Sequence, residues 1–267
     1  MKELLKSSLI KMLAIAGAFP TRMTNRTDLL LLLKRLHPVS TNRGLIRLGP
    51  RGDGGYLVPN DLAGIEACFS PGVSSVSGFE EDCTKLGMDA FLADKSVDQP
   101  AAENERFHFT KKFVGAVSND DFMTLDDWVT LSPMGATNSD LLLQMDIEGH
   151  EYEVFLSTSG ALMRKFRIIV AEFHQLDQLW NWPFYNLASR AFERILESHT
   201  CVHIHPNNCC GSLRKDGLDI PRVMEFTFLR TDRIERSSYQ SKFPNPLDFD
   251  NTSNATLTLP ECWHSED

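Results

Sequence analysis

Short apolar segments alternate with helix-like segments through the middle of the 267-residue chain, and this alternation constrains the fold more than any other feature. The apolar segments, which we predict to be β-strands, span residues 65–70, 88–93, 107–116, 141–145 and 166–173. Helices are predicted at 77–86, 125–131, 151–162 and 184–198. Strands that alternate with helices in this way form a parallel sheet that is covered on both faces. We therefore predict an α/β fold with a doubly wound, mostly parallel sheet.

The alternation ends at two final strands, predicted at 201–205 and 223–230, which are joined by 17 residues without a clear helix. This connection predicts an antiparallel hairpin, with an antiparallel strand at the edge of the sheet. Before the sheet, residues 1–46 are predicted to form a helical extension, in which five consecutive leucines at 29–33 indicate a buried helix. The predicted main domain then spans 47–235, and a loop-rich tail at 236–267 is expected to pack on it.

The composition argues against two classes of partner. The formal net charge is −9 and no basic run occurs, whereas binding to nucleic acid depends on clustered Lys and Arg. No stretch approaches the roughly 20 apolar residues of a transmembrane helix, and we interpret the N-terminus as an amphipathic helix rather than a signal peptide.

The six cysteines include no CxxC pair, which is typical of reduced thiols in an intracellular protein. We therefore expect a cytoplasmic protein, whose oligomeric state the sequence leaves open.

The first strand of the predicted sheet ends in a turn of small residues, Ser70-Pro71-Gly72-Val73-Ser74. Such a turn lets a ligand approach the backbone and the N-terminus of the following helix, where Ser77 and Glu80 match a capping box. Asp94 ends the second strand, 22 residues after Gly72, where a carboxylate can bind ribose hydroxyls. The turn lacks the GxGxxG pattern and the chain has no Walker A motif, which disfavours NAD and ATP as ligands.

The most specific motif is Asp146-Ile147-Glu148-Gly149-His150-Glu151, which ends the fourth strand and follows Thr124-Leu125-Asp126. Together with the Gly52-Asp53-Gly54-Gly55-Tyr56 block and the strand that ends in Glu172-Phe173-His174, it resembles the FkbM family of S-adenosylmethionine-dependent methyltransferases. The resemblance covers roughly residues 47–230. It implies a class I, Rossmann-like methyltransferase fold and S-adenosyl-L-methionine as the cofactor.

The resemblance also implies which residues contact this cofactor. Its methionine end would lie over the turn that begins at Gly72, Asp94 would hold the ribose, and residues 116–118 would flank the adenine. The full expected set is Gly72, Val73, Ser74, Glu80, Asp94, Val117, Ser118 and Asp146.

Polar side chains follow the ends of three successive strands, which are neighbours in a sheet of this kind. They are Asp146 and Glu148, then Glu172 and His174, then His203 and His205 followed by Asn207. Methyl transfer to an alcohol needs an aligned hydroxyl and the removal of its proton, by a base or through a metal ion. We expect Asp146, His174 and His205 to face the reacting group, with His174 or His205 as the general base. Alternatively, an ion such as Mg²⁺ or Mn²⁺ is held by Asp146, Glu172, His174, His205 and Asn207.

Some of these residues also have simpler interpretations. Glu148 and Glu151 can serve to charge the first turn of a helix, where carboxylates are stabilised by the helix dipole. His203 can be a structural histidine that is hydrogen-bonded inside the fold.

Four residues are candidates for contacts with the substrate. Trp180 and Trp182 follow the fifth strand, where exposed indole rings can stack on a sugar or form a packed lid. Asp53 and Tyr56 are expected to approach the same region from the other side.

Taken together, the residues and the resemblance predict an S-adenosylmethionine-dependent O-methyltransferase. The expected acceptor is a hydroxyl of a sugar or glycoconjugate. A divalent metal ion can assist the transfer but is not required by the prediction. Two alternatives stay open from the residues alone: a nicotinamide-dependent oxidoreductase on a Rossmann-like sheet, and a non-catalytic binding module of the same fold.

Overall fold

The computed structural model describes residues 2–15, 17–73, 76–235 and 238–264. Its centre is a seven-stranded sheet in the order β11-β14-β10-β9-β4-β5-β6. The strands are β4 (Ile65–Pro71), β5 (Asp89–Ala93), β6 (Phe107–Thr110), β9 (Asp140–Met145), β10 (Phe166–Phe173), β11 (His199–Pro206) and β14 (Met224–Arg230). The pairs β10–β9, β9–β4, β4–β5 and β5–β6 are parallel. The prediction of an α/β fold with a mostly parallel sheet is confirmed.

The antiparallel strand is not at the edge of the sheet, and that part of the prediction is wrong. β14 is antiparallel to both β10 and β11, and it lies between them. The edge strand β11 therefore runs parallel to β10. The edge position was inferred from the helix-free connection, but the polar residues of β14 are buried as in a central strand: Thr227 donates a hydrogen bond to the Leu57 carbonyl at 2.6 Å. The connection between the two strands holds a small hairpin, β12 (Ser212–Lys215) and β13 (Leu218–Pro221).

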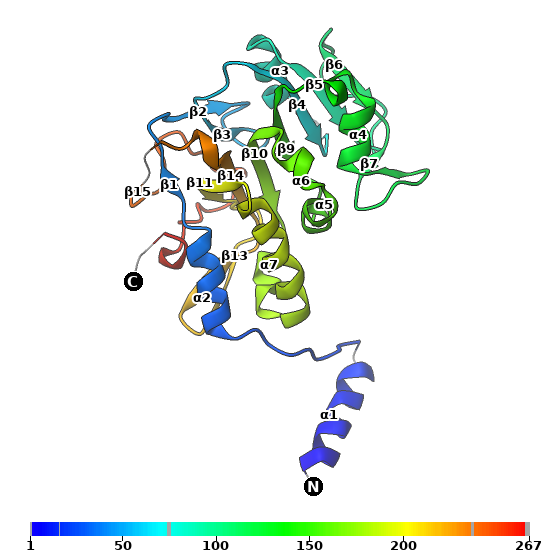
Figure 1. Cartoon of the computed structure of the whole chain (residues 1–267). Coiled ribbons are helices and arrows are strands. Elements are labelled where there is room, and N and C mark those ends of the chain that lie inside the picture. The colour runs from blue at the N-terminus through cyan, green and yellow to red at the C-terminus, as the bar shows by residue number, and fades with distance from the viewer. Residues whose placement is uncertain (1, 16, 74–75, 236–237, 265–267) are drawn as a thin grey trace.

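Each face of the sheet is covered by its own core. One face packs against α4 (Leu125–Leu131), α5 (Glu151–Ser157), α6 (Gly160–Met163) and α7 (Trp182–Leu196), which contribute to the larger cluster of buried apolar residues. The other face packs against α3 (Gly78–Lys85) and the hairpin of β2 (Leu45–Leu48) and β3 (Tyr56–Pro59). Figure 1 shows this layered arrangement, in which the carboxyl ends of the parallel strands lie at the same end of the sheet. Short 3₁₀ helices lie at Pro133–Ala136, Leu176–Trp180, Thr231–Arg233 and Glu261–Trp263.

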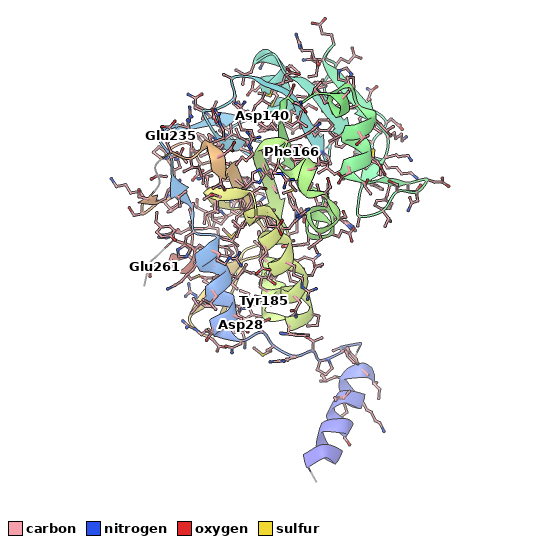
Figure 2. The ribbon with its side chains drawn as sticks, viewed as in Figure 1. Asp28, Asp140, Phe166, Tyr185, Glu235 and Glu261 are labelled. Atoms are coloured by element: carbon pink, nitrogen blue, oxygen red, sulfur yellow. The ribbon has the colours of Figure 1, made fainter. Side chains whose placement is uncertain are left out.

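The N-terminal region is helical only in part. α1 (Lys2–Ile15) projects away from the rest of the chain, and α2 (Arg26–Arg35) packs on the core through Leu29, Leu32 and Leu33 (Figure 1). Figure 2 shows where α2 meets α7: the Tyr185 hydroxyl donates to the Asp28 carbonyl at 3.1 Å. Residues predicted as helix beyond α2 instead form β1 (Val39–Ser40), paired with β15 (Ser238–Tyr239), and the start of β2. None of the helices in the described part of the chain is both long and apolar enough to cross a membrane.

Two further boundaries differ from the prediction, and each has a local cause. The strand predicted at 107–116 ends at Thr110, because two lysines interrupt the apolar run. The chain then forms β7 (Phe113–Val114), which pairs with β8 (Phe122–Met123). The helix predicted at 151–162 breaks at Thr158, and Ser159 caps the next helix by accepting the Leu162 N–H at 3.2 Å. The tail packs on the domain, with Trp263 fully buried.

Candidate active site

A cavity of about 530 Å³ opens at the carboxyl ends of β4, β5 and β9. Gly72 and Val73 line it from the end of β4, Asp94 from the end of β5, and Asp146 from the end of β9. Phe113, Val114 and Phe122 form an apolar wall. The cavity therefore combines carboxylates and a glycine turn with an apolar wall, and such a lining is typical of small-molecule sites.

Gly72 permits the close approach of two strand ends. Its φ is +93°, and a Cβ built at this position would lie 1.6 Å from the carbonyl oxygen of Asp146. The same turn is held by a hydrogen bond from the Gly72 N–H to the Ala93 carbonyl at 3.0 Å. A side chain here would force β4 away from β9, so the turn needs glycine for both conformation and space.

Asp94 is nearly buried at the mouth of the cavity. Its Oδ1 accepts hydrogen bonds from the N–H and the hydroxyl of Ser96, both at 2.6 Å. These contacts fix the orientation of the carboxylate at the end of β5, which is the position from which a ribose is bound in α/β sheets.

Other residues assigned to the cofactor lie elsewhere. Val117 is 65% exposed, and Ser118 contacts Asp127 and the Thr124 N–H; neither lines the cavity. The sequence placed them there because it extended the third strand to residue 116, whereas the chain turns after Thr110. Ser74 lies outside the described residues.

Glu80 is buried beneath the cavity rather than in its wall. Its Oε1 lies 2.5 Å from the Ser70 hydroxyl, which is also 2.6 Å from Gln144 Oε1. Because the Glu80 side chain is used there, the predicted capping box does not form, and Ser77 makes no side-chain hydrogen bond to the helix that it caps. Burial raises the pKa of Glu80.

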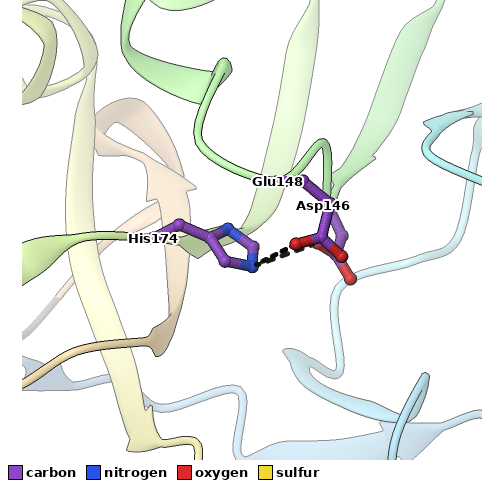
Figure 3. A group of neighbouring side chains, drawn as sticks. All are labelled: Asp146, Glu148 and His174. Atoms are coloured by element: carbon purple, nitrogen blue, oxygen red, sulfur yellow. Dashed lines mark ion pairs between the residues drawn. The ribbon is translucent and has the colours of Figure 1, made fainter. Parts of the chain in front are cut away.

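Beside the cavity, Asp146, Glu148 and His174 form a cluster in which one ligand atom from each residue lies within 4.8 Å of the others. His174 Nε2 is 3.8 Å from Asp146 Oδ1 and 3.5 Å from Glu148 Oε2. Figure 3 shows the imidazole of His174, from the end of β10, pointing toward the two carboxylates that follow β9. Glu172, also from β10, has its Oε1 3.5 Å from the same nitrogen. Asp146 therefore belongs both to the cavity wall and to this cluster.

The orientation of His174 is set by helix α5. Glu151 is fully buried, and its Oε1 accepts the N–H groups of Ile147 at 3.2 Å and Gly149 at 3.0 Å. The same oxygen lies 3.1 Å from His174 Nδ1, which therefore donates to it. Tyr152 donates its hydroxyl to the His174 carbonyl at 2.7 Å. Glu151 thus holds both the loop after β9 and the imidazole ring, so that Nε2 is the nitrogen turned toward the cluster.

A second polar group lies farther along the sheet. Glu172 faces Glu225 across β10 and β14, and Glu225 faces His205 across β14 and β11. Asn207 donates to Glu172 at 3.2 and 3.3 Å. His205 contacts the tail instead of Asp146: its Nε2 lies 3.1 Å from the Phe249 carbonyl. The structure therefore brings Asp146, His174 and Glu172 together and places His205 outside their cluster.

Histidine 203 has the structural position that the sequence left open for it. Its Nε2 is 2.9 Å from Asp248 Oδ1, and His205 Nδ1 is 3.6 Å from Asp248 Oδ2. Asn251, from the same tail segment, donates to Glu225 at 2.7 Å. The tail is thereby attached to β11 and β14, and sequence analysis missed both Asp248 and Asn251, because nothing near them resembles a motif.

Burial shifts the protonation of the cluster. It raises the pKa of Asp146 to about 7, with nearby carboxylates acting in the same direction and His174 opposing. Burial, Asp146 and Glu225 raise the pKa of Glu172 well above its usual value. Burial lowers the pKa of His174, but the hydrogen bond and charge of Glu151 outweigh it, so the net shift is upward. Groups perturbed by burial together with specific charged partners are typical of catalytic sites.

The four substrate candidates separate into two pairs. Tyr56 is buried, and the charges of Asp146 and Asp53 contribute to raising its pKa, behind the larger effect of burial. Trp180 and Trp182 lie against the N-terminal segment: the Trp180 carbonyl accepts the Thr24 N–H at 2.9 Å. Neither tryptophan lines the cavity. The sequence located these rings after the fifth strand but could not indicate that residues 22 and 24 form backbone hydrogen bonds with this segment.

Comparison with known proteins identifies the domain. Residues 72–199 match the family model of the methyltransferase FkbM domain. Residues 72–199 therefore carry an FkbM methyltransferase domain. The resemblance inferred from the Asp146–Glu151 motif is thereby confirmed, and the matched segment includes the cavity and His174. A search of curated proteins found no match to the chain.

Proposed function

We propose that this FkbM domain transfers a methyl group from S-adenosyl-L-methionine to a hydroxyl group at the carboxyl ends of β9 and β10. The observation that carries the proposal is the double position of Asp146, which lines the cavity and also belongs to the cluster with His174. A cofactor in the cavity would lie beside groups that can accept a proton. We further propose that the sheet is a Rossmann-like methyltransferase sheet and that residues 1–46 form an N-terminal extension to it.

The cavity residues fit the parts of this cofactor. Asp94, held by Ser96, would accept hydrogen bonds from ribose hydroxyls. The apolar wall of Phe113, Val114 and Phe122 would pack on the adenine, in place of the expected residues 117 and 118. The turn at Gly72 and Val73 would leave space for the methionine end.

The chemistry requires the loss of one proton from the acceptor. The hydroxyl oxygen attacks the sulfonium methyl, the carbon–sulfur bond breaks, and its electron pair returns to sulfur, which leaves S-adenosylhomocysteine. The proton passes to the cluster of Asp146, Glu172 and His174 by one of two routes. Either His174 Nε2 would accept it as a base, or Glu172 would accept it from a hydroxyl whose pKa a divalent ion held by these residues would lower.

The acceptor that we propose is a sugar or glycoconjugate. Carboxylate and amide groups such as Glu172, Asn207 and Asp53 suit neutral hydroxyls, and the net charge of −9 disfavours polyanionic acceptors. Asp53 and Tyr56 remain candidates for contacts with it. Trp180 and Trp182 lie outside the cavity, and their backbones are hydrogen-bonded to Thr24 and Arg22. His205, which contacts the tail, is assigned a structural role.

The test separates cofactor binding from transfer. Calorimetric titration with S-adenosylhomocysteine should show one saturable site in the wild type and in His174→Asn, because His174 does not line the cavity. With S-adenosylmethionine and a panel of mono- and oligosaccharides, His174→Asn should lose at least about 100-fold in methyl transfer measured by mass spectrometry. His108→Asn, on the half-exposed edge strand β6, is the matched control and should behave as wild type. If the protein binds NADH but not S-adenosylhomocysteine, methyl transfer is refuted and the oxidoreductase alternative takes its place.

A further inference from the structure

We propose that Asp146, Glu148 and His174 form a binding site for one divalent first-row transition-metal ion, of the Mn²⁺ or Fe²⁺ type. The role of the ion in activating a hydroxyl rests on the proposed function, but its binding does not. This set is narrower than the one expected from the sequence: it adds Glu148 and leaves out His205 and Asn207 as direct ligands.

The positions of the three side chains come close to those of a coordination shell. An ion held at about 2.1 Å from each ligand keeps adjacent ligand atoms about 3 Å apart. His174 Nε2 is already 3.5 Å from Glu148 Oε2 and 3.8 Å from Asp146 Oδ1. These two distances need to contract by less than about 1 Å, and all three ligand atoms already lie within 4.8 Å of one another. The Glu148 side chain is 85% exposed, so it is free to make this movement.

The cluster contains acceptors without a matching donor. Because His174 Nδ1–H donates to Glu151, a neutral imidazole presents a lone pair at Nε2. That lone pair faces carboxylate oxygens of Asp146, Glu148 and Glu172. Within the described residues, no Lys or Arg forms an ion pair with any of these three carboxylates. A proton on Nε2 could satisfy one oxygen at a time, whereas a divalent ion at the centre satisfies the oxygens and the lone pair together.

Two buried polar groups are directed at the same point. Asp146 Oδ1 is buried and has no hydrogen-bond partner, although a buried carboxylate oxygen normally has one. The Glu172 side chain is 5% exposed and points its Oε1 at His174 Nε2. Asn207 already donates to Glu172, so the group without a partner is Asp146 Oδ1, and an ion between Asp146 and His174 would supply the partner that it lacks.

The surrounding chain orients the ligands as metal sites do. The Glu151 carboxylate on the second imidazole nitrogen fixes the tautomer and the ring, in the way that carboxylates behind metal-bound histidines do. Glu148 adopts a φ of +57°, a left-handed conformation that is unfavourable for a non-glycine residue. Glu151 maintains this turn by accepting the N–H groups of Ile147 and Gly149 on either side.

The donor set selects the ion. Carboxylates alone favour Mg²⁺ or Ca²⁺, but an imidazole nitrogen favours a first-row transition metal, and the absence of thiolates disfavours soft ions. Such an ion, with three protein ligands, keeps positions open for an acceptor hydroxyl. Coordination would lower the pKa of that hydroxyl, and its proton would pass to solvent or to Glu172.

The test uses Mn²⁺ alone as the probe. Chelator-treated full-length protein is titrated with Mn²⁺, and the free ion is measured by electron paramagnetic resonance. We expect one bound ion per chain in the wild type and at least a tenfold weaker site in Glu148→Gln and in His174→Asn. Glu153→Gln is the matched control, because Glu153 is a half-exposed neighbour that pairs with His150 outside the cluster. It should bind Mn²⁺ as wild type does.

Circular dichroism confirms that each variant is folded before the binding is compared. Glu148 is exposed, so its variant is the one expected to keep the fold intact. The proposal is overturned if the wild type binds no Mn²⁺, or if Glu148→Gln and Glu153→Gln bind it equally. S-adenosylhomocysteine is titrated in parallel without metal. Binding of S-adenosylhomocysteine without Mn²⁺ binding refutes the ion site alone, and the reverse result refutes the proposed methyl transfer alone.

Discussion

Buried carboxylates have different partners at the two ends of the central sheet. At the amino end, Asp140 is paired with Arg230 at 2.6 Å and Arg167 at 2.7 Å, and Asp61 is paired with Arg233 at 2.8 Å. At the carboxyl end, Asp146 and Glu172 lie beside His174, and Glu172 faces Glu225 across β10 and β14. Figure 3 shows the Asp146 carboxylate beside His174. The two ends therefore differ in partners more than in the kind of side chain.

The pKa values follow this difference. Burial raises the pKa of Asp140 and Asp61, but arginines outweigh it and the net shift is downward. For Glu172 and Glu225, burial raises the pKa and no arginine reverses the shift. The amino end thus uses carboxylates to stabilise the fold, whereas the carboxyl end holds them in a form that destabilises the fold and suits ligand binding or proton transfer.

The largest effect on the free energy of unfolding is expected from Asp140→Asn. The change removes the carboxylate shared by Arg167 and Arg230, whose side chains are 8% and 16% exposed, and leaves them only Asp61 at 3.9 Å and the exposed Asp232. Removing one partner of such a group should cost about 3 kcal/mol, measured by urea denaturation. The affinity for S-adenosylhomocysteine should stay within about twofold, since Asp140 lies at the opposite end of the sheet.

The control for this variant is Asp232→Asn. Asp232 also contacts Arg230, at 2.8 Å, but its side chain is 64% exposed. Its loss should cost less than about 0.5 kcal/mol. Equal destabilisation by the two variants would show that the amino end is not a special ion-pair network.

The next effect is expected from Gly72→Ala at the carboxyl end. The new Cβ would meet the Asp146 carbonyl oxygen at 1.6 Å, so β4 and β9 must separate beside the cavity. We expect the affinity for S-adenosylhomocysteine to fall by at least about 100-fold, or about 2.7 kcal/mol, by calorimetry.

Gly87→Ala is the control that separates backbone strain from the steric clash between a Cβ at position 72 and the Asp146 carbonyl. Gly87 has the same φ of +93°, but a Cβ there would have no atom within 4 Å. It should lower the stability by about 1 kcal/mol and leave the affinity unchanged. Comparable affinities in the two variants would mean that the contact between Gly72 and Asp146 does not shape the binding site.

The smallest effect is expected from Glu225→Gln, and its sign is opposite to that of Asp140→Asn. Burial is the main cause of the raised pKa of Glu225, so the folded protein binds its proton more tightly than the unfolded chain does. Its contribution to stability is therefore lost as the pH rises from about 4.3 through the raised value. At pH 7, Glu225→Gln should raise the free energy of unfolding by about 1 kcal/mol, because Asn251 can still donate to the amide oxygen.

Urea denaturation between pH 4 and 8 measures both the gain and the slope. The variant should show a smaller decrease of stability with rising pH than the wild type. Glu66→Gln, at an exposed position of β4, removes the same charge and should change the stability by less than about 0.5 kcal/mol. If Glu225→Gln is less stable than the wild type, the carboxylates at the carboxyl end do not destabilise the fold, and the two ends of the sheet do not differ in this way.

Most of the sheet could be predicted because its strands are continuous apolar runs with clear ends. β10 and α4 begin and end at the predicted residues, and Thr124 caps α4 as its position suggests. The place of β14 could not be predicted, since strand order depends on long-range pairing.

The sequence by itself determined the class of fold, the FkbM motif and the strand ends that carry Gly72, Asp94, Asp146 and His174. These features depend on residues that are close together in the chain, so local spacing is enough to reveal them. The tertiary structure decided which polar residues meet. It joined Glu148 and Glu151 to His174, attached His205 to the tail, and covered Trp180 with the N-terminal segment. The physical reason is that each of these contacts joins residues from separate elements, and their geometry exists only once the sheet has packed.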